Sequence, residues 1–206
     1  MQVKKLLFVF TLSLFIYPIA AQNIGDFVSV EPLTQSTDFV IPSSHTFQVI
    51  AETGDALSEG GTLPLKPDFA GYVPISASST NGYLSVNHEN VPGDVTIFDI
   101  NYNATTQLWE STASEAIDFS GFGDTAANCS GTVTPWGTII SSEEAPSLPL
   151  DFNFDGYNDV GWNVEIDPVT KTVIDKRWAM GNFAHENVTI HSNHRTVYQG
   201  ADEDHV

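Results

Sequence analysis

The sequence predicts an all-β protein, with a β-propeller as one architecture that fits, from three observations. Of the 206 residues, 15 are Gly and 11 are Pro, and Val, Ile, Thr and aromatic residues are frequent between them. The segments rich in these strand-forming residues are short and are bounded by Gly, Pro, Asn or Asp, as in proteins made of many short strands. Some segments also pair into strand–turn–strand hairpins, which are the unit of a propeller blade.

The expected strands follow one another at short intervals. We predict them at residues 46–51, 82–87, 95–101, 109–111, 137–142, 161–166 and 196–200. The turn NYNATTQ at 101–107 closes one hairpin, and the turn DPVTK at 167–171 closes a second. No segment has a convincing helical pattern. A β-sandwich produces similar spacing, so periodicity alone leaves a propeller and a sandwich as two alternatives.

The N-terminus has the pattern of a secretory signal peptide over residues 1–21. Two lysines precede an apolar run that begins at Leu6, and small residues close the run at Ala20 and its neighbour. The run is shorter than the roughly 20 residues that a membrane-spanning helix needs, and Pro18 interrupts it. We therefore expect export to the periplasm or the medium, a mature chain beginning near Gln22, and no membrane span within that chain.

Acidic residues greatly outnumber basic ones. The chain has 26 Asp and Glu against 7 Lys and Arg, with a net charge of −19. A field of this sign repels nucleic acid and anionic lipid and attracts cations, so we expect neither nucleic acid nor membrane as a partner. An anionic substrate would bind only where metal ions reverse the local sign. Acidic residues also keep exported proteins soluble, so their location must decide between these roles.

The stretch most informative about chemistry is NCSGTVTPWGTIISSEE at residues 128–144. It contains the single cysteine of the chain, Cys129, so no intramolecular disulfide can form. Two adjacent carboxylates, Glu143 and Glu144, end the same hairpin-sized segment. A thiolate with carboxylates is a mixed soft and hard ligand set, suited to a transition metal such as iron with calcium beside it. A lone cysteine is also a common small core residue, and the residues alone leave this alternative open.

A second candidate metal site is the loop DFNFDGYND at residues 151–159. Oxygen ligands at alternate positions surround the turn-forming Gly156, as in the first half of an EF-hand loop. Trp162 stands where an EF-hand has its bidentate Glu, and no flanking helix is predicted. A structural Ca2+ site and a solvated acidic turn therefore remain two alternatives. The candidate calcium ligands are Asp151, Asn153, Asp155 and Asp159.

Other catalytic groups give weaker signals. His185, His191 and His194 are loosely spaced and have no Cys or His partner at zinc-finger spacing. Catalysis by a Ser-His-Asp triad has no support, because the sequence has no Gly-x-Ser-x-Gly elbow. Arg177 and Arg195 are candidate phosphate clamps, and a solvated surface role is the alternative for each.

Five sequence blocks occur in one order along the chain. Besides residues 128–144, they are GYLSVNHE at 82–89, GWNVEIDP at 161–168, GNFAHE at 181–186 and VYQGADED at 197–204. Together they resemble the PhoX-type bacterial alkaline phosphatases, and the resemblance runs from about Phe39 to the C-terminus. The run Ser130-Gly131-Thr132 differs from the small-Gly-Gly run of that family, and the loop at 145–159 is particular to this chain.

The resemblance implies a β-propeller with a cluster of Fe3+ and Ca2+ at its centre, which hydrolyses phosphate monoesters and sometimes diesters. It implies that Cys129 is an iron ligand and that Glu144 is the carboxylate that joins it. Further metal contacts would come from Glu89, Glu186 and Asp202. The residues placed around the cluster are Glu143, His185, Glu203 and Asp204.

The resemblance also bears on domain organisation. Residues 22–206 would be the N-terminal portion of a monomeric phosphatase domain, and part of the family's site lies in residues beyond Val206. We therefore expect a truncated chain that is incomplete as a catalyst. Two other functions remain alternatives: a non-catalytic, calcium-stabilised propeller that binds a carbohydrate or a protein surface, and a propeller hydrolase for another ester, such as a lactone or phosphotriester.

Overall fold

The computed structural model describes residues 28–31, 39–42, 45–145, 150–151 and 154–202. The chain divides into two compact units, Met1–Phe47 and Gln48–Val206. The described part of the first unit has no regular secondary structure, and in it the rings of Phe39 and Phe47 meet edge to face with centroids 4.8 Å apart. The signal peptide expected at residues 1–21 lies outside the described residues.

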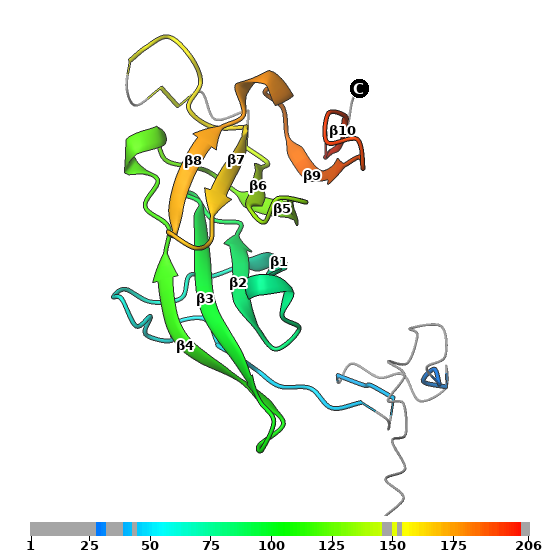
Figure 1. The fold of residues 1–206 in the computed structure, drawn as a ribbon. Helices are drawn as coiled ribbons and strands as arrows, with labels where there is room; N and C mark the ends of the chain where they lie inside the picture. Colours follow the sequence, from blue (N-terminus) through cyan, green and yellow to red (C-terminus); the bar gives the residue numbers. More distant parts are fainter. Residues whose placement is uncertain (1–27, 32–38, 43–44, 146–149, 152–153, 203–206) are drawn as a thin grey trace, which may run out of the picture. The chain divides into compact units, whose positions relative to one another are not determined.

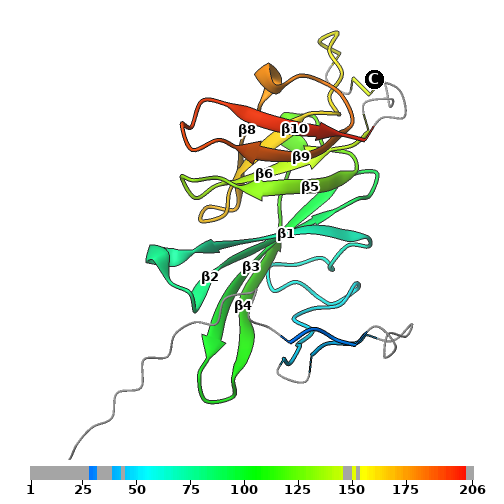
Figure 2. The same cartoon turned by 90° about the vertical axis from the view of Figure 1, so that its right-hand side faces the viewer.

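The second unit contains three antiparallel sheets (Figures 1 and 2). The first has four strands in chain order: β1 (Pro67–Pro74), β2 (Asn81–His88), β3 (Asp94–Asn103) and β4 (Leu108–Ala116). The second repeats this order with β5 (Asn128–Val133), β6 (Ile139–Glu143), β7 (Asn163–Asp167) and β8 (Thr172–Lys176). The third consists of β9 (His185–Ile190) and β10 (Val197–Ala201).

Four antiparallel strands in chain order are the arrangement of a propeller blade, so the predicted all-β, partial propeller fold is confirmed. The described residues contain no α-helix. Their only helical segments are three 3-10 turns: η3 (Ile75–Ala77), η4 (Ser120–Phe122) and η5 (Trp178–Met180). None of these described helices has the length and apolar character needed to cross a membrane.

The first strands of the three sheets pack against one another. Strand β5 contacts β1 on one side and β9 on the other (Figure 2). In each sheet the beginning of the first strand is paired with the end of the second, through Pro67 and His88, Asn128 and Glu143, and His185 and Ala201. The beginnings of β1, β5 and β9 and the ends of β2, β6 and β10 therefore share one edge of the assembly.

The space between the first two sheets is filled by apolar side chains. Val95 and Ile97 of β3 belong to the same buried cluster as Ile139 of β6 and Val164 and Ile166 of β7, and all five are fully buried. The opposite face of the first sheet forms a second cluster, with Leu57, Leu63, Phe98 and Ile100. Burial of this apolar surface stabilises the stacking of the sheets that positions their shared edge.

The prediction of a strand at residues 46–51 is wrong, because this segment forms no ladder in the structure. Instead, the side chain of Gln48 bonds to the backbone of Trp109 in β4, donating from Nε2 to the carbonyl oxygen at 2.6 Å and accepting the N–H at 2.8 Å. One amide side chain thus takes the place of a strand neighbour. Strands β1 and β9 were not predicted, and β5 was recognised only as part of a hairpin-sized segment.

Gly131 allows the close pairing of β5 and β6, which gives a first prediction. A Cβ atom at this position would overlap the backbone carbonyl oxygen of Ile140, which cannot rotate away. We predict that Gly131→Ala lowers the free energy of unfolding by roughly 1–3 kcal/mol, measured by urea denaturation. The control is Gly121→Ala, where a Cβ atom meets nothing within 4 Å; a comparable loss in both variants would contradict the steric explanation.

Candidate metal centre

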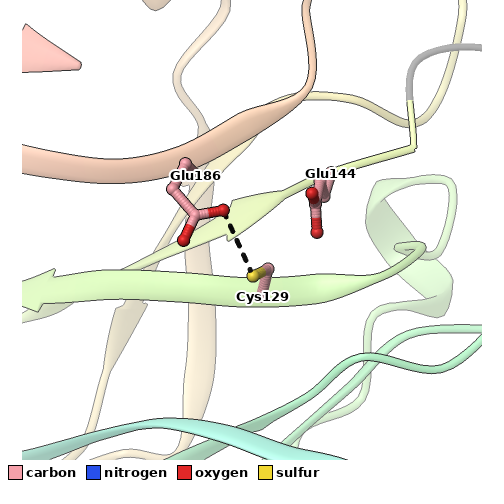
Figure 3. Close-up of side chains that lie close together, drawn as sticks. All are labelled: Cys129, Glu144 and Glu186. Carbon is pink, nitrogen blue, oxygen red and sulfur yellow. Dashed lines mark hydrogen bonds between the residues drawn. The ribbon is translucent and has the colours of Figure 1, made fainter. Parts of the chain in front are cut away.

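The thiol of Cys129 lies among carboxylates at the shared edge of the sheets. Cys129 is buried near the beginning of β5, and its Sγ is 3.5 Å from Oδ2 of Asp68 and 3.7 Å from Oε2 of Glu186. Potential ligand atoms of Cys129, Glu144 and Glu186 all lie within 4.8 Å of one another (Figure 3). The structure thus brings together three of the residues predicted to bind metal.

These side chains come from equivalent positions in successive sheets. The second residue of the first strand is, in the three sheets, Asp68, Cys129 and Glu186. The residue directly after the second strand is, in the same order, Glu89, Glu144 and Asp202. Each sheet therefore contributes two ligand-type side chains to the shared edge, and the sequence analysis identified five of these six residues.

Asp68 is the member of this set that the sequence analysis missed. It belongs to β1, whose sequence PDFAGYVP has Pro at both ends and a central Gly, so that it does not read as a strand. Asp68 also lies 61 positions before the cysteine that it contacts. The one available signal is the repetition itself, since in each sheet a thiol or acid near the start of the first strand is matched by an acid after the second.

The electrostatics of the group fit a bound cation. Burial raises the pKa of the Cys129 thiol far above its usual range, and the carboxylates of Asp68, Glu144 and Glu186 raise it further. Burial, followed by hydrogen bonding to Asp202, raises the pKa of Glu144 to about 7. The protein thus gathers anionic groups that disfavour one another's charge. A metal ion relieves this repulsion and binds the deprotonated forms, and sulfur with oxygen donors is a set that a transition metal accepts.

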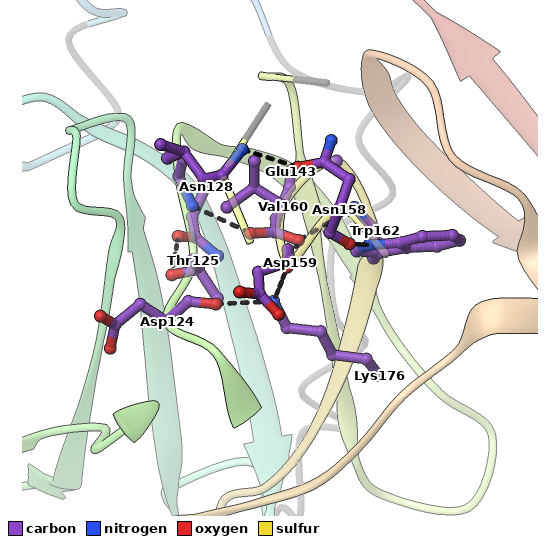
Figure 4. A network of polar contacts seen from close by, with 12 residues as sticks. Asp124, Thr125, Asn128, Glu143, Asn158, Asp159, Val160, Trp162 and Lys176 are labelled. Atoms are coloured by element: carbon purple, nitrogen blue, oxygen red, sulfur yellow. Dashed lines mark hydrogen bonds and ion pairs between the residues drawn. The ribbon is translucent and has the colours of Figure 1, made fainter. Parts of the chain in front are cut away.

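Glu143, the residue directly before Glu144, belongs to a buried ion pair and its network of polar contacts (Figure 4). Nζ of Lys176 is 3.6 Å from Oε2 of Glu143, and both side chains are fully buried. The Glu143 carboxylate also accepts the backbone N–H groups of Ala126 and Trp162, each at 2.9 Å. The Lys176 ammonium donates to two backbone carbonyl oxygens, those of Asp124 and Asp159.

Burial and the ion-pair partner act in opposite directions on the pKa of each residue of this pair. Burial raises the pKa of Glu143 to about 7, although Lys176 and the two N–H donors lower it. Burial lowers the pKa of Lys176, and Glu143 opposes that change. Since Glu143 immediately precedes Glu144, the pair fixes the backbone that presents the second of these carboxylates. The N–H of Glu144 in turn donates to the carbonyl oxygen of Ala127 at 2.9 Å.

The residue before the thiol is fixed by side-chain hydrogen bonds. Asn128 is fully buried, accepts from Oγ1 of Thr125 at 2.7 Å and donates to Oγ of Ser141 at 2.9 Å. His185, which precedes Glu186, is also fully buried. Its Nδ1 is 3.0 Å from Nδ2 of Asn163 and its Nε2 is 3.0 Å from the carbonyl oxygen of Gly181, while burial lowers its pKa. Neutral His185 therefore accepts at Nδ1 and donates at Nε2.

The two arginines are not brought to the thiol. The guanidinium of Arg177 bonds to Glu165 and lies 3.4 Å from Asp175. Arg195 lies in the turn between β9 and β10, where its N–H donates to Asn193. That turn is at the far end of β9 from Glu186, which at a rise of about 3.3 Å per residue is on the order of 15 Å away. The phosphate-clamp role of Arg195 therefore has no geometric support.

The predicted calcium loop is described only in part. The Asp151 carboxylate accepts the N–H groups of Asp155 and Gly156 at 3.1 and 3.0 Å, so it closes a turn. Asp155 is exposed, whereas Asp159 is buried against Gly123. Asn153, Glu203 and Asp204 lie outside the described residues. The structural Ca2+ site in this loop stays a prediction.

The buried ion pair gives a second prediction. We expect Lys176→Met to lower the free energy of unfolding by about 3–5 kcal/mol, because Glu143 keeps its burial but loses its counter-charge. Adding Glu143→Gln should restore part of this loss in urea denaturation. The control is Lys171→Met, because the side chain of its partner Asp99 is 32% exposed. This variant should lose less free energy of unfolding. Equal losses at the two lysines would show that burial of the pair is unimportant.

Comparison with known proteins agrees with this architecture. No curated protein matches the chain. One solved structure, Pseudomonas fluorescens PhoX in complex with vanadate, a transition state analogue, matches with a TM-score of 0.53 and 17% sequence identity over 73% of this chain and 42% of that one. The likeness shows a shared fold, and the chain spans less than half the length of that protein. The family model described as alkaline phosphatase PhoX matches residues 104–206, half of the sequence, and the chain therefore belongs to the PhoX alkaline phosphatase family.

Proposed function

We propose that residues 22–206 are the N-terminal portion of an exported, metal-dependent phosphatase that hydrolyses phosphate monoesters, and sometimes diesters, at an iron and calcium centre. The observation that carries the proposal is the buried thiol of Cys129 between carboxylates from two neighbouring sheets. Family membership supports the phosphatase class. The signal-peptide pattern at residues 1–21 supports export.

The donor types suggest how the metals are shared. Cys129 supplies the soft ligand, so iron is assigned to the thiol with Glu144 and Glu186, since one ligand atom from each of these residues lies within 4.8 Å of the others. Asp68 is within reach of the same thiol. Glu89 and Asp202 occupy the remaining equivalent positions and supply hard oxygen ligands suited to calcium.

The scarcity of basic groups supports metal-dependent phosphate binding. Arg177 is already paired with Glu165, and Arg195 lies at the far end of β9. The centre itself is rich in carboxylates, which repel a phosphoester. Bound metal ions would supply the missing positive charge for the phosphoryl oxygens and lower the pKa of bound water. The Pseudomonas PhoX structure contains vanadate, a transition state analogue, which supports phosphoryl chemistry in this fold.

The metal assignment gives a third prediction. We expect elemental analysis of the purified wild-type protein to find iron together with calcium, and Cys129→Ser to lose the iron because a hydroxyl is a far poorer soft ligand. Turnover of p-nitrophenyl phosphate, measured on the longest form that the coding region encodes, should fall to background in the same variant. Asp68→Asn should lower metal content without removing the thiol.

A matched control separates the centre from the general acidity of the chain. Glu110 is exposed in β4 and bonds to Asn103, so Glu110→Gln removes a carboxylate away from the thiol. It should keep both metals and full turnover. Iron content and turnover unchanged in Cys129→Ser would rule out the proposed centre, and calcium without iron in the active wild-type protein would rule out the iron assignment.

A further inference from the structure

Strand β5 is irregular at the thiol. Asn128 pairs with Glu143 and Gly131 pairs with Ser141, so Cys129 and Ser130 together stand opposite the single residue Ser142. Such a β-bulge locally disrupts the hydrogen-bond ladder and redirects the side chains of the bulged strand. The bulge thus determines where the Cys129 thiol points, and its backbone groups need partners from outside the regular ladder.

Asn87 of the neighbouring sheet supplies those partners. From β2, its Nδ2 donates to the carbonyl oxygens of Cys129 at 3.0 Å and of Ser130 at 2.8 Å. One side-chain amide therefore binds both residues of the bulge. Asn87 is fully buried and lies 42 positions before Cys129 in the sequence. These contacts tie the bulge of the second sheet to the end of β2, two residues before Glu89.

The other end of the amide contributes no hydrogen bond within the described structure. Oδ1 of Asn87 is buried and has no hydrogen-bond partner within the described structure. A buried polar atom without a partner costs about 1–3 kcal/mol, so a smaller or apolar residue would avoid that cost. What Asn87 provides in return is the pair of N–H groups that hold the bulge.

We propose that Asn87 is a positioning residue for the metal-binding thiol: by binding both carbonyl groups of the β5 bulge, it aims Sγ of Cys129 at the carboxylates of Asp68 and Glu186. The inference rests on the proposed metal centre and adds to it a residue that touches no ligand atom. Residues that orient metal ligands commonly change metal affinity by about 10–100-fold when they are replaced.

The test uses Co2+ alone as the probe and the full chain freed of metal. Co2+ bound to a thiolate gives a charge-transfer absorption band, which reports the thiol directly and needs no turnover. Affinity is measured by following this band for the wild-type protein, Asn87→Ser and Asn87→Ala. Serine retains one donor while having nearly the volume of alanine, so the comparison separates hydrogen bonding from packing.

Ser85→Ala is the matched control, because Ser85 is fully buried two residues earlier on the same face of β2 and its Oγ has no partner in the described structure. We expect Asn87→Ala to weaken Co2+ binding by about 10–100-fold, Asn87→Ser to recover part of that loss, and Ser85→Ala to bind as the wild type does. Circular dichroism checks that each variant folds.

Other results would overturn the proposal in distinguishable ways. Wild-type affinity and an unchanged band in Asn87→Ala would show that the thiol is aimed without Asn87. The loss of Co2+ affinity could instead be equal in Asn87→Ser, Asn87→Ala and Ser85→Ala, or both Asn87 variants could unfold. Either result would show that Asn87 serves the packing of the sheet and does not position the thiol. Absence of a thiolate band in the wild-type protein would instead refute the metal centre itself.

Discussion

The buried ion pair between Lys176 and Glu143 is the interaction on which the organisation of the site depends. It joins the ends of β6 and β8 and, through the same two side chains, the backbone around residues 124–126 and 159–162. A pair removed from water requires such additional hydrogen bonds, because each charge would otherwise lose solvation without replacement. The loops at this edge are consequently fixed by one network, and Glu144 extends from it.

The candidate metal centre results from repetition of a simple unit. Each sheet places one side chain near the beginning of its first strand and one just after its second, and packing of the first strands brings these positions together. No single segment of the sequence contains the centre. The sheets differ in the type of side chain at these positions: the second residue of the first strand is Asp68 in the first sheet and Cys129 in the second.

Much of the fold and of the site was predictable, and the failures have physical causes. The strands from β2 to β4 and from β6 to β8 carry apolar residues that pack between the first two sheets or on the opposite face of the first sheet. Composition and turn residues therefore indicate where these strands lie. The first strands β1, β5 and β9 face the polar edge and contain Pro, Gly, Asn or His, and their pattern is correspondingly weak. The candidate ligands that lie in recognisable blocks could be named from the sequence, whereas Asp68 and the contacts of Asn87 depend on which sheets become neighbours.

The spacing of the candidate ligands along the chain has a consequence for folding. Cys129 contacts side chains 61 positions before it and 57 positions after it. With a single cysteine, the chain cannot close such loops by a disulfide. A metal ion held by these residues would act as a three-way cross-link between separate sheets, restricting the unfolded chain as well as serving the site. Loss of metal would then loosen the attachment of β9 to β5, because Glu186 of β9 and Cys129 of β5 are two of the residues that the ion would hold.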